Sequence, residues 1–280
     1  MKVVKARHAG ACYGVERALD MAYASILDNE RAFTLGPLIH NPQEVGKLSA
    51  KGVSVAESLD EVDEGVVIIR SHGVVPQVKI EAEQKGLSVI DATCPHVARA
   101  QKAALSLAQD GYNVIIVGEN GHPEVEGMKA YAQGESNTVL VVSDVVDLPE
   151  QIDEPLGIVV QTTQSKENLD AVVSALQKRG LEPRVKNTIC FATRQRQEAA
   201  AELADEVDVI IVIGGRNSSN TTRLYEICKQ RCERSYHVEL PEEIDAAWFK
   251  PHDVVGVSAG ASTPEDQIDA VIAHLESLIP

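Results

Sequence analysis

The sequence contains no apolar run long enough to span a membrane. A spanning helix needs ~20 consecutive apolar residues, and no run in this chain approaches that length. The N-terminal segment, Met1–Arg7, is basic but precedes no apolar stretch of the length of a secretory signal. We therefore expect a soluble, cytoplasmic protein without a membrane partner.

Positive charge is also scarce. Lys and Arg number 26 against 42 Asp and Glu, so the formal net charge is −16 at pH 7. Phosphate backbones are bound by basic surfaces, so we expect no nucleic-acid partner. A small anionic ligand in a locally positive pocket stays compatible with this composition.

Nucleotide-binding motifs and linkers are absent as well. The Gly214-Gly215 pair does not form a G-x-G-x-x-G segment, and there is no P-loop. No linker, low-complexity tract or long charge run interrupts the chain. With 280 residues, 44% of them hydrophobic, it can form one large α/β domain or two to three small ones.

Cysteine is sparse but patterned. The count of five is odd, and a cytoplasmic setting disfavours structural disulfides, so metal binding or catalysis is the better default. Cys12, Cys94 and Cys190 each follow an apolar, strand-like run. Helical patterns follow them over residues 15–27, 97–107 and 195–207. A side chain at such a junction lies at a helix N-terminus, where the macrodipole favours a thiolate.

An internal repeat accompanies the three cysteines. Polar residues end the next predicted strand, and His40, His122 and Ser218 each come 28 residues after one of the cysteines. The repeat predicts one α/β unit used three times.

Strand–helix alternation predicts mainly parallel sheets in three pseudo-threefold-related α/β lobes around a central cavity. The predicted lobes span residues 12–93, 94–189 and 190–280. The third lobe lacks its last strand at the C-terminus. We therefore expect the N-terminal segment, residues 1–11, to complete that lobe.

Three cysteines from three lobes match one kind of metal site. They can hold three irons of a [4Fe-4S] cluster and leave the fourth iron open to substrate. The alternatives are three buried, unligated cysteines, or a zinc site completed by His96, for which the usual short ligand spacings are absent. Cys228 and Cys232 lie four residues apart at the end of a helical pattern, and we expect them to pack or face solvent.

Strand ends also carry groups suited to an anion. His40, His72 and His122 each stand at a strand end beside a helix-start signal, and residues 217–222 form a hydroxyl- and amide-rich turn before another helix. Helix N-termini with neutral donors favour phosphate. A lone histidine is more often a half-buried side chain with its hydrogen bonds satisfied, but three at related positions favour ligand binding.

Glu124 follows His122 and Pro123 at the predicted rim of the cavity. A carboxylate there can hydrogen-bond or transfer protons. It can equally be a first-turn helix acid that complements the helix dipole. Spacing alone leaves both interpretations open.

Eight short segments follow one another in order over almost the whole chain. They are Gly10–Val15, Leu38–Pro42, Ser71–Val74, Asp91–Pro95, Gly121–Gly127, Gln161–Thr163, Asn217–Asn220 and Ala259–Ser262. In combination they resemble the motifs of the 4-hydroxy-3-methylbut-2-enyl diphosphate reductase family, also called LytB. Two departures, Ala11 in place of an aromatic residue and His96 in place of an apolar one, remove no functional position.

The resemblance implies a three-lobed α/β fold with a central [4Fe-4S] cluster. It implies the reductive removal of the substrate's allylic hydroxyl group, giving isopentenyl and dimethylallyl diphosphates. By its motifs, it implies cluster ligands at Cys12, Cys94 and Cys190, and action at the hydroxyl group by Glu124 and Thr162. It implies that the diphosphate is bound by His40, His72, His122, Ser218, Ser219, Asn220 and Ser262. It also implies a ferredoxin or flavodoxin as electron donor.

Two other functions stay open on the sequence. Quinolinate synthase shares the three-cysteine, three-lobed plan, but its carboxylate substrate favours arginines at strand ends. Arg70 and Arg216 are the only obvious candidates there. The other function is a zinc-stabilised module that binds a phosphate ligand.

Overall fold

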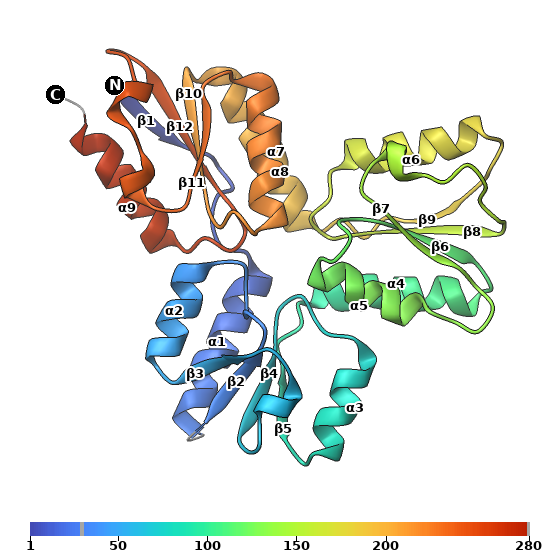
Figure 1. Ribbon diagram of the computed structural model, residues 1–280. Coiled ribbons are helices and arrows are strands. Elements are labelled where there is room, and N and C mark those ends of the chain that lie inside the picture. Colours follow the sequence, from blue (N-terminus) through green and yellow to red (C-terminus); the bar gives the residue numbers. More distant parts are fainter. Residues whose placement is uncertain (29–30, 279–280) are drawn as a thin grey trace. The chain divides into compact units, whose positions relative to one another are not determined.

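The computed structural model describes residues 1–28 and 31–278. Three four-stranded sheets are interleaved with helices, and every strand pairing in them is parallel (Figure 1). The predicted fold class, three α/β lobes with parallel sheets, is confirmed. By its contacts the chain divides into two compact units: Met1–Val15, His40–Gln43 and Phe191–Pro280 in the first, Glu16–Ile39 and Glu44–Cys190 in the second.

The first unit contains one sheet, with strand order β1-β12-β10-β11. The N-terminal strand pairs with the last strand of the chain, Lys2 beside Val254 and Lys5 beside Val257. Its elements are β1 (Lys2–Lys5), α7 (Phe191–Glu206), β10 (Val209–Ile213), α8 (Ser219–Arg231), β11 (Ser235–Val238), the short helices Pro241–Glu243 and Ala246–Trp248, β12 (Val254–Ala259) and α9 (Glu265–Ser277).

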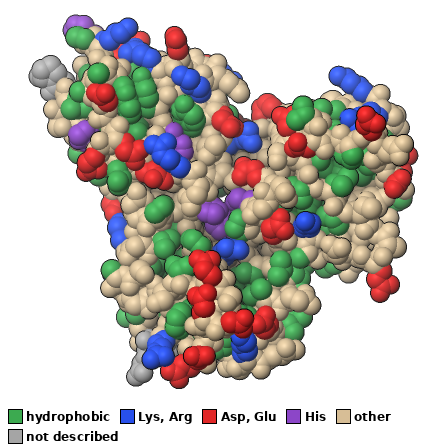
Figure 2. Space-filling model, viewed as in Figure 1, with side chains coloured by type: hydrophobic (Ala, Val, Ile, Leu, Met, Phe, Trp, Pro, Cys, Tyr) green, Lys and Arg blue, Asp and Glu red, His purple; other side chains and the backbone are tan. Residues whose placement is uncertain are grey.

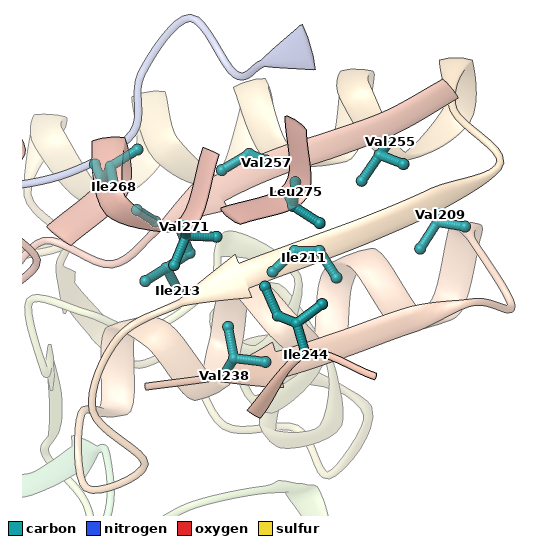
Figure 3. Packing of buried hydrophobic residues seen from close by; sticks show 11 residues of the cluster. Val209, Ile211, Ile213, Val238, Ile244, Val255, Val257, Ile268, Val271 and Leu275 are labelled. Atoms are coloured by element: carbon teal, nitrogen blue, oxygen red, sulfur yellow. The ribbon is translucent and has the colours of Figure 1, made fainter. Parts of the chain in front are cut away.

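Helices cover both faces of this sheet. Strand β10 is apolar at every position, so it has apolar side chains to bury on each face. Successive strand residues point to opposite faces. Val209, Ile211 and Ile213 pack with Val271 and Leu275 of α9 (Figure 3). The intervening residues, Ile210 and Val212, pack against α7 and α8 on the other face. A continuous apolar run is typical of a central parallel strand buried on both sides.

The second unit contains two sheets, with strand orders β3-β2-β4-β5 and β7-β6-β8-β9. The strands of the first sheet and the helices before and between them along the chain are α1 (Tyr13–Asp28), β2 (Ala32–Leu35), α2 (Pro42–Ala50), β3 (Val53–Ala56), the short helix Leu59–Glu61, β4 (Val66–Ile69), α3 (Pro76–Gln84) and β5 (Ser88–Asp91). Those of the second are α4 (Pro95–Gln109), β6 (Asn113–Val117), α5 (Pro123–Ala132), β7 (Val139–Val142), the short helix Val145–Asp147, β8 (Leu156–Val160), α6 (Lys166–Lys178) and β9 (Arg184–Lys186).

The second of these sheets repeats the packing of the first unit. Ile115 and Val117 of β6 pack against α6, whereas Val114 and Ile116 pack against α4 and α5.

Acidic side chains are spread over the visible surface, with Lys and Arg among them (Figure 2). Within the described residues, no helix combines the length and apolar character needed to cross a bilayer.

Candidate active site

Three cysteines occupy equivalent positions in their sheets. Each comes directly before a helix, α1, α4 or α7, and each is partly exposed and free of a disulfide. Each backbone N–H donates to a carbonyl in the loop that follows the neighbouring strand. The pairs are Cys12 to Ala261 at 3.1 Å, Cys94 to Ser71 at 2.9 Å and Cys190 to Thr162 at 3.0 Å. One local geometry is therefore used three times, as the repeat predicts.

These positions suit thiolate ligands. A helix N-terminus stabilises negative charge, and Cys94 is itself the N-cap of α4, with Pro95 in its first turn. Three thiols outside any disulfide, in the same backbone setting, are the donor chemistry that holds an iron–sulfur cluster. The residues present fit such a group.

Cys228 and Cys232 differ from these three. Both are buried in the core between β10, α7 and α8. The Cys228 thiol donates to the carbonyl of Ala200 at 3.8 Å, and burial raises its pKa to about 12. A thiol held in its neutral form is a poor metal ligand. Of the two expected settings for these residues, packing or facing solvent, the structure shows packing.

Glu124 and Thr162 form a buried pair in the second unit. Glu124 lies in the first turn of α5 and is 1% exposed. Its Oε1 accepts from the backbone N–H of Thr162 at 2.6 Å, and its Oε2 accepts from the Thr162 hydroxyl at 2.9 Å. Burial raises the pKa of Glu124 to about 7, although both Thr162 hydrogen bonds act in the opposite direction. Glu124 is therefore poised to hold or release a proton near neutral pH.

His122 caps the same helix. Its Nδ1 accepts from the backbone N–H of Glu124 at 3.1 Å. Burial, and then the charge of Arg70, lower the pKa of His122 to about 4, so the ring is neutral at pH 7. Because Nδ1 accepts, the ring proton belongs on Nε2. A neutral N–H donor beside a helix N-terminus suits a phosphate oxygen.

His72 adjoins His122 in the same unit. Their ring centroids are 5.5 Å apart and the rings meet edge to face at 88°. Ser71 is held by two hydrogen bonds to the Leu38 carbonyl, from its N–H at 3.1 Å and its hydroxyl at 3.0 Å. Gly73 has a φ of 72°, and a Cβ there would lie 2.6 Å from Nε2 of Gln101. The turn that presents His72 therefore requires glycine.

The N-terminus of α8 carries buried polar side chains in the first unit. The Ser218 hydroxyl caps the helix by accepting from the backbone N–H of Thr221 at 3.3 Å. Ser219 and Asn220 follow in the first turn and are buried. Both amide atoms of Asn220 are buried without a hydrogen-bond partner among the described residues. Such a group is costly unless a ligand pairs with it, and at a helix N-terminus that ligand is anionic.

His40 lies against this helix end. A Cβ on Gly215 would be 2.7 Å from the His40 carbonyl oxygen. The next residue, Asn41, donates from Nδ2 to the Ser262 carbonyl at 2.8 Å and to Oε1 of Gln267 at 2.9 Å. The segment at His40 thus connects the turn at Ser262 with the turn before α8.

The predicted site residues fall into two groups, each brought together within one unit. The first group is Cys12, His40, Ser218, Ser219, Asn220 and Ser262; the second is Cys94, Cys190, His72, His122, Glu124 and Thr162.

Arg196 supports the first group and is not predicted by the sequence. Its guanidinium donates to the Gly10 carbonyl at 2.9 and 2.7 Å and to the Ala11 carbonyl at 2.9 Å. It thereby fixes the loop before Cys12. In the sequence it is one of several Arg and Gln residues in a helical pattern, so nothing there distinguishes it.

Comparison with known proteins identifies related chains. The family model described as LytB protein matches residues 3–276. A 4-hydroxy-3-methylbut-2-enyl diphosphate reductase of Trichlorobacter lovleyi is 49% identical, with 99% of each chain covered. The reductase of the same name from Geobacter sulfurreducens is 47% identical, covering 99% of this chain and 97% of its own.

Two solved structures agree with these relatives. A structure of (E)-4-hydroxy-3-methyl-but-2-enyl diphosphate reductase, described as the terminal enzyme of the non-mevalonate pathway, is 44% identical with a TM-score of 0.72. It covers 99% of this chain and 100% of its own. The Plasmodium falciparum E-1-hydroxy-2-methyl-but-2-enyl-4-diphosphate reductase is 25% identical with a TM-score of 0.90, covering 97% and 87%.

Proposed function

The chain belongs to the LytB protein family, and we propose that Cys12, Cys94 and Cys190 hold the [4Fe-4S] cluster of its active site. The chain is an oxidoreductase that removes the hydroxyl group of 4-hydroxy-3-methylbut-2-enyl diphosphate, the last reaction of the non-mevalonate route. The observation that carries the cluster proposal is the repeated hydrogen bond of each cysteine N–H to the loop after the neighbouring strand.

The reaction consumes two electrons and two protons and releases isopentenyl or dimethylallyl diphosphate and water. When bound, the cluster supplies the electrons and a Lewis-acidic iron. Hydroxide is a poor leaving group, so the departing oxygen needs a proton. Glu124 is the proton donor in this proposal, because its pKa of about 7 keeps a large fraction protonated at neutral pH.

Thr162 orients that carboxyl group. Its N–H and its hydroxyl each contact one oxygen of Glu124, so the carboxyl plane is fixed at both atoms. The burial of the pair keeps bulk water away from the proton. A fixed donor lowers the entropic barrier to proton transfer.

The diphosphate is bound, in the same proposal, by the polar groups of the two helix N-termini. His122 and His72 act beside α5, and Ser218, Ser219 and Asn220 act at α8. His40 and Ser262 complete the set from the neighbouring turns. The unpaired amide of Asn220 supports this assignment because a phosphate oxygen can accept from its Nδ2.

A ferredoxin or flavodoxin supplies the electrons in this proposal, because the sequence has no dinucleotide motif. We also assign the enzyme to the cytoplasm. None of its five cysteines forms a disulfide in the described part of the chain, and an oxidising compartment would favour disulfides.

The test is turnover by protein reconstituted with iron and sulfide without oxygen. With reduced methyl viologen and 4-hydroxy-3-methylbut-2-enyl diphosphate, we expect both isopentenyl and dimethylallyl diphosphates. NADPH without an electron-transfer protein should give neither product. Product formation by protein without iron would overturn the cluster proposal. Turnover with NADPH alone would overturn the donor proposal.

A further inference from the structure

Helix α4 differs in charge from the rest of this acidic chain. It begins directly after Cys94, and among the α-helices of the described residues it alone contains no Asp or Glu. Arg99 and Lys102 are exposed on it. Neither side chain forms an ion pair with any residue in 1–28 or 31–278.

The edge strand β9 extends this basic surface. Lys186 donates from Nζ to the Ser106 hydroxyl of α4 at 3.1 Å, and Arg184 pairs with Asp110 after the helix at 3.1 Å. The residues Arg99, Lys102, Arg184 and Lys186 are called the basic strip below. Asp110 contacts the strip through its ion pair with Arg184.

The basic strip lies on two elements that are next to the cysteines of the second unit along the chain. Cys94 is the N-cap of α4, and Cys190 follows β9 by four residues. With a rise of about 1.5 Å per helical residue, Arg99 and Lys102 lie about 8 and 12 Å along the helix axis from Cys94. A partner bound at this end of the strip is therefore held close to the thiols.

We propose that the basic strip is the docking surface for the electron donor, a small acidic electron-transfer protein. The inference rests on the proposed function and names the surface through which that function receives electrons. The net charge of −16 repels an acidic partner as a whole, so docking requires a local region of opposite sign. Free arginine and lysine side chains at such a place steer association and set its dependence on salt.

The experiment compares two double variants with the same change in net charge. Arg99→Glu/Lys102→Glu reverses the strip, and both new acids lie before the last turn of α4, where the helix dipole would oppose them. The matched control is Lys2→Glu/Lys178→Glu, at two exposed lysines for which no ion pair is found in the described part of the chain.

Turnover is measured with reduced methyl viologen and with a reduced acidic ferredoxin, at low and high salt. We expect the viologen rates of all proteins to agree within about 2-fold. For Arg99→Glu/Lys102→Glu the KM for ferredoxin should rise at least ~10-fold at low salt, with a weaker salt dependence, while the control stays within about 3-fold of the parent.

A ferredoxin KM for the strip variant equal to that of the control would overturn the proposal. Direct titration of isotope-labelled ferredoxin, followed by NMR, decides the same question if turnover is lost: equal affinity of the two variants also overturns it. Absence of viologen-driven turnover in the parent would instead count against the proposed function, independently of docking.

Discussion

Glu124 is the residue at which burial and chemistry are most closely connected. If it only completes the start of α5, replacing it should change stability by about 1 kcal/mol or less and leave turnover intact. If it donates the proton, Glu124→Gln keeps the shape but has no acidic proton: its oxygen can still accept from the Thr162 N–H, and its amide N–H can donate to the Thr162 hydroxyl. We predict a folded, iron-replete protein that turns over at least ~100-fold more slowly.

The measurement is steady-state turnover with reduced methyl viologen, on proteins matched for iron. Glu126→Gln is the control, because Glu126 lies two residues further along the same helix and its acceptor role towards the Gly121 N–H survives the change. A Glu124→Gln rate within a few-fold of the Glu126→Gln rate would return Glu124 to a helix-capping role.

The raised pKa of Glu124 also predicts how stability depends on pH. The group takes up protons more readily in the folded chain, with a pKa of about 7 against 4.5 for the free side chain. Its contribution to stability is fully present below pH 4.5 and is lost as the pH rises to about 7. Between these two pH values, the titration of Glu124 lowers the free energy of unfolding by about 1.4 kcal/mol for each unit by which the pH rises.

Denaturant unfolding of the parent and of Glu124→Gln between pH 4.5 and 8 measures this contribution. The difference between their free energies of unfolding should change over that range and level off above about pH 7. A difference that is constant with pH would show that Glu124 titrates like an ordinary exposed carboxyl group.

At the scale of single residues, the sequence predicts identities better than environments. The three cysteines, the histidines and the Ser218–Asn220 turn stand out by type and spacing. The acidity of Glu124 depends on burial and on Thr162, which is 38 residues away, so spacing leaves its role open. The role of Arg196 could not be predicted from the sequence either, because its partners Gly10 and Ala11 are distant in the chain.

At the scale of elements, the strand–loop–helix junction is the repeated structure. Apolar periodicity predicts helices over residues 15–27, 97–107 and 195–207, whereas the helices are Tyr13–Asp28, Pro95–Gln109 and Phe191–Glu206. Each begins at least two residues earlier than the pattern. The first turns, which follow the cysteines, carry exposed residues such as Tyr13 and Phe191 that periodicity cannot place on the buried face.

The N-terminal strand offers a test of how the sheet of the first unit is completed. The Lys2 N–H donates to the carbonyl of Asp253, directly before β12, at 3.0 Å, and the Ala6 N–H donates to Val257 of β12 at 2.8 Å. The two-residue period of the strand directs the N–H of Val4 to the same side. Val4→Pro removes this hydrogen bond and should lower the free energy of unfolding by about 1–3 kcal/mol.

The control is Lys5→Pro, because the N–H of Lys5 points away from β12. Lys5→Pro also removes the ion pair between the Lys5 side chain and Glu265, but this pair is exposed and is worth about 1 kcal/mol at most. Denaturant unfolding gives the free energies of unfolding of both variants, and we expect the loss to be larger for Val4→Pro than for Lys5→Pro. Equal destabilisation would mean that pairing of β1 with β12 contributes little to the unit.

At the scale of the whole molecule, the fold and the charge distribution serve different steps. Three parallel sheets place equivalent loops after equivalent strands, and those loops carry the thiols and the anion-binding groups. The acidic side chains are spread over the surface shown in Figure 2, so the basic strip on α4 and β9 is a local departure from the overall charge. The sequence gives the net charge directly, but this grouping of four basic residues depends on how β9 lies against α4.

The central claim is that Cys12, Cys94 and Cys190 hold the iron–sulfur cluster. The most direct test is the iron and sulfide content of single serine variants at all five cysteines, purified and reconstituted without oxygen. We predict that Cys12→Ser, Cys94→Ser and Cys190→Ser each lose the cluster and turnover, whereas Cys228→Ser and Cys232→Ser retain both, since the latter two thiols are buried in the core. Full iron and sulfide in any of the first three variants, or their loss in either of the last two, would contradict this assignment.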